Sequence, residues 1–247
     1  MLTGLDGNKR FELKYRLNYF SYLKVRNMVS SYMKKDIFTH RAEHKGYLVR
    51  SLYFDTYDYK SYLEKMSGDS DRIKFRIRSY ADKLKEETPI KVELKVRKAN
   101  SVEKYSTIID KEALEYFMEH RTWKNSEDPV LSEFSRYLHL KDLQPKIITE
   151  YRREGFYSRL KDDLRITIDH EVRSAHSRSL FPEHVFFRQH HPFGLVLEIK
   201  FKDKQPTWLK ELIQRNGLKL IANSKFTQGI QVARKDLYHP GGVVIVR

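Results

Sequence analysis

The chain has 247 residues, of which 40% are hydrophobic and 33% are charged. The hydrophobic share is below that of a typical globular protein, but a chain of this length can still form a substantial core. Its 48 Lys and Arg outnumber its 33 Asp and Glu, which gives a formal net charge of +15 and points to an anionic partner: nucleic acid, a membrane surface or a phosphorylated small molecule. The absence of cysteine excludes disulfides and thiolate metal sites.

Strands dominate the elements expected along the chain. Alternation of apolar and polar residues predicts strands at 10–17, 46–54, 72–80, 89–97, 102–109, 146–153, 164–168 and 195–201, with a shorter one at 218–221. Apolar residues at helical spacing, or a polar start signal, predict helices at 19–34, 55–65, 208–216 and 226–238, and two more within 111–139. Residues 174–194 are expected to form a loop with a helical turn, and the tail 241–247 an added edge strand.

About eight strands with helices between groups of them favour an α+β fold built on an antiparallel sheet, either open or closed into a barrel. No Pro/Gly/Ser-rich linker divides the chain, so we expect one domain over 1–247, with a core at about 10–238 and a C-terminal tail at 239–247. The N-terminus lacks the apolar segment of a signal peptide, and no apolar run approaches the ~20 residues of a membrane span. We therefore expect a cytoplasmic protein.

The stretch RIKFRIRSY, residues 72–80, has a basic side chain at every second position. Successive side chains of a strand point to opposite faces, so one face of this strand is apolar and the other is positively charged. The charged face carries Arg72, Lys74, Arg76 and Arg78. Five further strands repeat the pattern, and their charged faces carry Glu12, Lys14 and Arg16; Lys91, Glu93, Lys95 and Arg97; Tyr151 and Arg153; Arg165, Thr167 and Asp169; and Glu198 and Lys200.

Two interpretations of the charged faces remain open. An antiparallel sheet with helices on one face and water on the other has such a pattern routinely. However, these faces are rich in Arg, and like charges on neighbouring strands destabilise a sheet unless something lies between them. A sheet curled around its charged face would enclose a multiply charged anion, which Arg and Lys bind through charge-assisted hydrogen bonds.

The few acidic residues on these faces suit a metal ion. A polyphosphate chain needs a divalent cation for neutralisation, and Mg²⁺ and Mn²⁺ take oxygen ligands. Glu198, and secondarily Glu12 and Glu93, are the candidate ligands. A plain salt bridge to a neighbouring strand is an equally valid interpretation of each.

Other signals add no second site. The His-rich segment at 190–194 matches no zinc spacing, and DGNK at 6–9 lacks the P-loop pattern. The 16 Tyr and 14 Phe could stack nucleic-acid bases, but most fall on apolar faces or helices, where core packing is the favoured role. No nucleic-acid partner is therefore expected.

Eight short motifs occur in order along most of the chain: FELKY at 11–15, SLYFDT at 51–56, KFRIRSY at 74–80, ELK at 93–95, YRREGF at 151–156, RITID at 165–169, LEIK at 197–200 and SKF at 224–226. Each motif is weak alone, but their ordered set is specific. Together they resemble the VTC-type polyphosphate polymerase domain, a branch of the triphosphate tunnel metalloenzymes.

The resemblance implies an eight-stranded antiparallel β-barrel, a tunnel with a charged interior and surrounding helices. It implies transfer of the γ-phosphate of ATP onto a growing polyphosphate chain, with Mn²⁺ or Mg²⁺ and an orthophosphate or pyrophosphate primer. The residues that would stabilise the transferred phosphoryl group are Arg76, Arg78, Arg153 and Lys200. Those that would bind phosphate are Lys14, Lys95, Lys104, Tyr151, Arg165 and Lys225, and Glu198 would hold the metal.

Two departures from the family pattern bear on function. The triphosphatase branch opens with two spaced glutamates before a lysine, whereas only Glu12 precedes Lys14 here, which favours the polymerase branch. The eukaryotic proteins add a phosphate-sensing domain and membrane spans, and this sequence shows neither. We therefore expect that export of product would need a membrane partner. A triphosphatase acting on inorganic or nucleotide triphosphates, and a non-catalytic polyphosphate-binding module, remain the alternatives.

Overall fold

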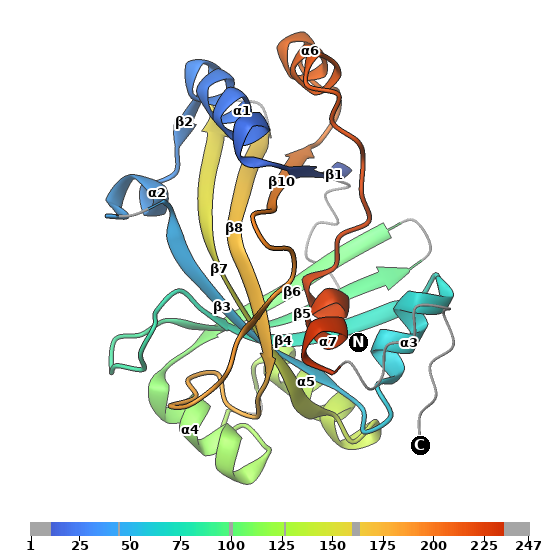
Figure 1. The fold of residues 1–247 in the computed structure, drawn as a ribbon. Helices are drawn as coiled ribbons and strands as arrows, with labels where there is room; N and C mark the ends of the chain where they lie inside the picture. Colours follow the sequence, from blue (N-terminus) through green and yellow to red (C-terminus); the bar gives the residue numbers. More distant parts are fainter. Residues whose placement is uncertain (1–10, 44, 99–100, 126, 160–163, 235–247) are drawn as a thin grey trace.

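The computed structural model describes residues 11–43, 45–98, 101–125, 127–159 and 164–234 (Figure 1). The strands within these ranges are β1 Phe11–Leu17, β2 Met33–Lys35, β3 Tyr47–Asp55, β4 Arg72–Ser79, β5 Ile90–Lys98, β6 Ser101–Ile109, β7 Gln144–Ser158, β8 Arg165–His176, β9 Arg188–Gln189 and β10 Leu195–Phe201. The helices are α1 Tyr19–Tyr32, α2 Ile37–Arg41, α3 Lys60–Ser67, α4 Lys111–His120, α5 Pro129–Leu140, α6 Thr207–Arg215 and α7 Lys225–Ala233.

Side-chain caps explain where most of these helices begin. Asn18, Asp36, Asp110, Asp128 and Ser224 precede α1, α2, α4, α5 and α7, and each accepts a hydrogen bond from a backbone N–H of the first turn. Among the described residues, no helix combines the length and the apolar character that crossing a membrane requires.

Eight strands form one antiparallel sheet in the order β1-β10-β8-β7-β3-β4-β5-β6, with β2 and β9 added beside β7 and β8. The sheet curls into a half-barrel surrounded by helices (Figure 1). Within the described residues the edge strands β1 and β6 do not pair with each other, but the curl brings Lys95 Nζ on β5 within 3.6 Å of Glu12 on β1. The eight-stranded antiparallel fold expected from the sequence is confirmed.

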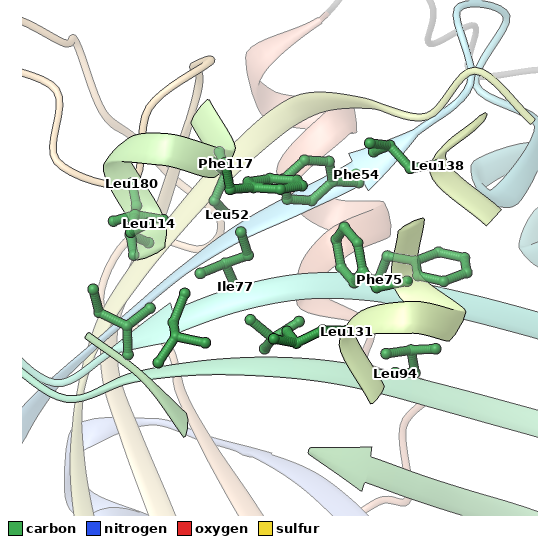
Figure 2. Packing of buried hydrophobic residues seen from close by; sticks show 14 of the residues in the cluster. Leu52, Phe54, Phe75, Ile77, Leu94, Leu114, Phe117, Leu131, Leu138 and Leu180 are labelled. Atoms are coloured by element: carbon green, nitrogen blue, oxygen red, sulfur yellow. The ribbon is translucent and has the colours of Figure 1, made fainter. Parts of the chain in front are cut away.

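Apolar side chains of β3, β4 and β5 point away from the concave face and meet α4 and α5. Figure 2 shows this cluster, which includes Leu52, Phe75 and Leu94 from the strands and Phe117 from α4. Phe134 on α5 is completely buried and contacts the rings of Phe54, Phe75, Phe117 and Trp123, mostly edge to face. This cluster keeps the outer face of the sheet dry.

A second apolar cluster covers the outer face of β1, β8 and β10. Tyr15, Ile168 and Leu197 contribute from the strands, while α1 contributes Val25 and Val29, both completely buried. Because alternate residues of these strands point outward into this cluster, the residues between them point into the half-barrel.

Helix α7 lies against the concave face, where Phe226 and Ile230 pack with Tyr53 of β3 and Ile147 of β7. Gly229 makes this close approach possible, because a Cβ atom there would lie 2.8 Å from Ile147 Cγ2 and 2.8 Å from Ser174 Oγ. The seating of α7 brings its first residue, Lys225, and the preceding Ser224 to the inner face of the sheet.

Several boundaries differ from those expected. The first helix ends at Tyr32 rather than at residue 34, because Met33–Lys35 pairs with β7 as β2. The short helix after β3 begins at Lys60 rather than at residue 55, since Asp55 still belongs to the strand. The five-residue α2 was not expected, being too short to show a period.

The segment 174–194 contains no helical turn. Strand β8 continues through it to His176, and Arg188–Gln189 pairs back on β8 as β9. The strand expected at 218–221 is reduced to one bridge between Leu220 and Tyr15, and the tail 241–247 lies outside the described residues.

We expect Phe134→Ala to lower the free energy of unfolding by about 3–5 kcal/mol, because it leaves a cavity among four rings. Urea denaturation measures the effect. The matched control is Phe20→Ala, a residue of α1 that is 77% exposed, which should change the value by less than about 0.5 kcal/mol. Equal effects for the two variants would contradict this account of the core.

Candidate functional site

A cavity of about 760 Å³ lies on the concave face of the half-barrel. The charged side chains of β4 line it along the whole strand, from Arg72 at one end to Arg78 and the following Tyr80 at the other, and these two ends are called its mouths below. Of the described residues that line it, fourteen are basic and four are acidic. The cavity is therefore a partly open space with a large excess of positive charge.

Every residue predicted from the sequence to act in the site lines this cavity. They come from seven strands and α7: Glu12 and Lys14 (β1), Arg76 and Arg78 (β4), Glu93 and Lys95 (β5), Lys104 (β6), Tyr151 and Arg153 (β7), Arg165 (β8), Glu198 and Lys200 (β10) and Lys225 (α7). Three residues of the charged faces do not line the cavity: Arg16, Thr167 and Asp169. The guanidinium of Arg16 instead lies 2.8 Å from His191 Nε2.

Glu93 joins three cations on one side of the cavity. Its carboxylate lies 2.6 Å from Arg76 Nε and 3.6 Å from Arg78 Nε, and it also pairs with Lys104. Burial alone would raise the pKa of Glu93, but these cations outweigh burial and hold that pKa far below its ordinary value. The carboxylate is therefore permanently charged and holds the three basic groups in place.

A second network lies across the β1–β10 pair, where Lys14 stands opposite Glu198 and Glu12 opposite Lys200. Lys14 Nζ is 2.6 Å from Glu12 and 3.7 Å from Glu198, and Lys200 Nζ is 2.5 Å from Glu198. Burial opposes ionisation of Glu198, yet Lys200, Lys14 and Arg153 hold its pKa well below the ordinary value. Two charged carboxylates thus share one lysine inside the cavity.

The third network was missed by sequence analysis, which placed Asp169 on a charged face without assigning it a role. Asp169 is completely buried and accepts hydrogen bonds from Arg153 Nε at 2.6 Å and Nη2 at 2.9 Å, while Lys225 Nζ lies at 2.5 Å. Burial opposes its ionisation, but the two cations lower its pKa to about 2. The ring of Tyr151 lies beneath both cations, with its centroid 5.2 Å from Arg153 Cζ and 4.6 Å from Lys225 Nζ.

The oxygen atoms near Lys14 fit a divalent metal ion. Glu12 and Glu198 supply two carboxylates, and Asn223 lines the same cavity with its backbone oxygen 3.1 Å from Lys14 Nζ. The side-chain oxygen of Asn223 is buried and has no hydrogen-bond donor among the described residues. The described residues contain no group of three or more His, Asp or Glu that could hold a metal ion by itself, so phosphate or water would have to supply the remaining ligands.

The sequence matches the family model of the VTC domain over residues 9–234. The chain belongs to the VTC domain family. Its resemblance to that family, first seen in the ordered motifs, is thereby confirmed.

Solved structures give weaker similarities to this VTC domain. A putative adenylate cyclase from Bacillus halodurans shares 16% identity at a TM-score of 0.49, covering 86% of this chain and 92% of its own. A protein from Pyrococcus horikoshii shares 14% sequence identity at a TM-score of 0.46, covering 89% of this chain and 97% of its own. The Mimivirus capping enzyme triphosphatase shares 10% identity at a TM-score of 0.34, covering 83% of this chain and 87% of its own. These likenesses are too weak to bear on activity. No curated protein matches the sequence significantly.

Lys74 is a further cavity residue of this VTC domain that the site prediction left out. Among the described residues its only hydrogen bond is to Ser224 Oγ at 3.0 Å, whereas Lys14, Lys95, Lys104, Lys200 and Lys225 each pair with a carboxylate. Burial, together with nearby Lys95 and Arg72, lowers the pKa of Lys74 to about 7. The alternation of β4 already placed it on the charged face.

Two histidines of the His-rich segment contact neighbouring side chains. His190 Nε2 lies 2.8 Å from Ser174 Oγ, and burial lowers the pKa of His190 to about 3. Its neighbour His191 contacts Arg16. This histidine pair therefore helps to hold the loop against β8 and β1 as neutral rings.

We expect an anion in the cavity to protonate Lys74, because a nearby phosphate favours the charged amine. Above pH 7, tripolyphosphate binding to the wild type should therefore take up more protons than binding to Lys74→Arg, whose side chain is always charged. Calorimetry at pH 8 in buffers of different ionisation enthalpy measures the uptake, and comparing the two proteins cancels the titration of the ligand. Equal uptake would contradict the lowered pKa.

The same shift predicts how Lys74 affects stability without ligand. Between pH 7 and about 10.4 the unfolded chain holds the Lys74 proton and the folded protein does not, so this residue makes stability rise with pH. Lys74→Arg should remove that rise, as urea denaturation at pH 7 and pH 9.5 would measure.

Proposed function

We propose that this VTC domain is a polyphosphate polymerase that transfers the γ-phosphoryl group of ATP onto a growing inorganic polyphosphate chain. The observation that carries the proposal is the cationic cavity, which follows β4 from Arg72 to Arg78 and encloses fourteen basic side chains. A space of this length and charge can hold a donor triphosphate and an acceptor chain end to end. Membership of the VTC domain family supports the same reaction.

The charge state of the acidic residues favours a phosphate acceptor over water. A hydrolase gains from a general base whose pKa lies near the working pH. The pKa values of Glu12, Glu93, Asp169 and Glu198 are all lowered, because bound Lys and Arg outweigh burial, so these carboxylates are poor bases. The terminal oxygen of a phosphate chain is already ionised and needs no base.

In the proposed step, a terminal oxygen of the chain, or of an orthophosphate or pyrophosphate primer, attacks the γ-phosphorus in line. The new P–O bond forms as the bond from the γ-phosphorus to the β,γ-bridging oxygen breaks, and ADP leaves with that electron pair. Arg76, Arg78, Arg153 and Lys200 would stabilise the equatorial and leaving oxygens. Phosphates would be held along the cavity by Lys14, Lys95, Lys104, Tyr151, Arg165 and Lys225.

Glu198 and Glu12, with the free side-chain oxygen of Asn223, would hold Mg²⁺ or Mn²⁺. When bound, this ion supplies positive charge that neutralises phosphate oxygens and polarises the phosphorus under attack. Glu93 is less suited to this role, because three cations already surround its carboxylate.

Product analysis separates the proposed reaction from its alternatives. The purified protein is incubated with ATP and Mn²⁺, and the products are resolved by gel electrophoresis. Chains longer than triphosphate support a polymerase. Orthophosphate without chains indicates a triphosphatase, and binding of polyphosphate without any turnover indicates a non-catalytic module.

We expect Arg76→Ala and Arg78→Ala each to lower chain synthesis at least 100-fold, the range found when one donor to a transition-state oxyanion is removed. Arg136→Ala is the matched control, since Arg136 lies on α5 outside the cavity and pairs with Glu133. Initial rates of ADP release measure the effect, and circular dichroism checks the fold. Near-wild-type synthesis by both folded variants would count strongly against the assignment.

We expect Glu198→Gln to raise the Mn²⁺ concentration needed for half-maximal turnover at least tenfold, because one charged ligand becomes neutral. Glu103→Gln is the control, since Glu103 also lines the cavity but bonds to the Tyr105 hydroxyl. Titration with Mn²⁺ at saturating ATP measures both. If Glu198→Gln lowers turnover with no change in the Mn²⁺ requirement, Glu198 serves as a salt-bridge partner alone.

A further inference from the structure

Three aromatic rings cluster at one mouth of the cavity, and the proposed chemistry does not use them. Phe38 comes from α2, Tyr47 begins β3, and Tyr80 follows β4. The Phe38 ring lies 5.4 Å from that of Tyr47 and stacks on that of Tyr80 at 6.0 Å with an interplanar angle of 12°, while the two tyrosine rings are 5.9 Å apart. Tyr47 and Tyr80 line the cavity, and Phe38 remains 54% exposed beside them.

Cations begin immediately inside this mouth. Arg153 and Arg165 act electrostatically on Tyr47, and Arg78 and Lys91 act on Tyr80. All four of these basic residues line the cavity. The mouth therefore offers the exposed ring of Phe38, with the partly buried rings of Tyr47 and Tyr80, next to a row of cations suited to phosphate.

The opposite mouth has a different chemistry. Lys65 from α3, Arg72 from β4 and Arg97 from β5 line it. Burial and the charges of Arg72 and Arg97 lower the pKa of Lys65, so the cations here stand close enough to repel one another. One mouth thus suits a polyanion, and the other suits a molecule with both a flat ring and phosphates.

We propose that Phe38, Tyr47 and Tyr80 form a stacking seat for the base of a purine nucleoside triphosphate, so that the donor nucleotide enters the cavity by this mouth. The inference rests on the proposed function, because it requires a nucleotide as phosphoryl donor. A base stacked on exposed aromatic faces gains free energy without any hydrogen-bond readout. The phosphates of such a nucleotide would extend inward toward Arg78 and Arg153.

The competing account of Phe38 is structural. Its ring could simply fasten α2 to the sheet, where the N-cap Asp36 accepts from Thr39 N at 2.8 Å and lies 3.4 Å from Arg165. Loss of the ring would then disturb Arg165 and weaken every phosphate ligand alike. A stacking seat instead weakens only ligands that carry a base.

The test compares two ligands by calorimetry, without turnover: a non-hydrolysable ATP analogue and inorganic tripolyphosphate. Phe38→Ala should raise the Kd of the ATP analogue roughly five- to thirty-fold, within the range for removal of one stacking ring, and leave the Kd of tripolyphosphate within twofold. Phe38→Trp should restore tight binding of the analogue. Phe186→Ala, at a ring that is 80% exposed and outside the cavity, should change neither ligand.

The outcomes separate this inference from the proposed function. An unchanged ratio of the two Kd values in Phe38→Ala, whether both stay constant or both rise, overturns the stacking seat. A changed ratio in a protein that makes no polyphosphate supports the seat and contradicts the polymerase.

Discussion

Repulsion among like charges that line one concave cavity is the constraint on which the rest of this structure depends. Fourteen basic side chains line the cavity against four acidic ones, so ion pairing inside it cannot balance the charge. Cations on adjacent strands destabilise a sheet when nothing lies between them, and burial raises the cost. Burial, and after it the repulsion of neighbouring cations, lowers the pKa values of Lys74 and Lys95. A multiply charged anion among these cations would replace repulsion by attraction. An anion that binds only the folded state stabilises that state.

The protein tolerates this interior because its stability comes from elsewhere. The two large apolar clusters lie on the convex side of the sheet, under α4 and α5 in one half and under α1 and α6 in the other. Side chains of one strand alternate between the two environments, so that Phe75 and Ile77 anchor the backbone that presents Arg76. Core and cavity are thus two faces of the same strands. The charged face can be unfavourable in isolation while the outer face supplies the burial that folding requires.

Most of the site could be predicted from the sequence because strand alternation is local. Residues 72–78 and 91–97 show which side chains share a face before any pairing is known, and every residue named from those faces for the site lines the cavity. What could not be predicted depends on pairing over long distances. The extension of β8 to His176, and the position of Phe38 beside Tyr80, are set by contacts between segments far apart in the chain. Lys74 was left out of the site for a different reason: its place on the charged face was plain, but only the structure shows that, among the residues it describes, Lys74 bonds to the Ser224 hydroxyl and not to a carboxylate.

The few acidic residues of the cavity explain how its basic side chains can be held in position before a ligand binds and can then change partners. Each carboxylate holds its lysines or arginines in place before ligand arrives, which limits the reorganisation that binding requires. In the proposed function, phosphate oxygens would take over Lys14 and Lys200, and the oxygens of Glu12 and Glu198 would lose their cationic partners while remaining ionised. Two adjacent anions without counter-charge would attract a divalent cation more strongly than the paired groups do. Binding of phosphate and of metal at this end of the cavity would then be mutually reinforcing, since each would relieve the repulsion that the other leaves behind.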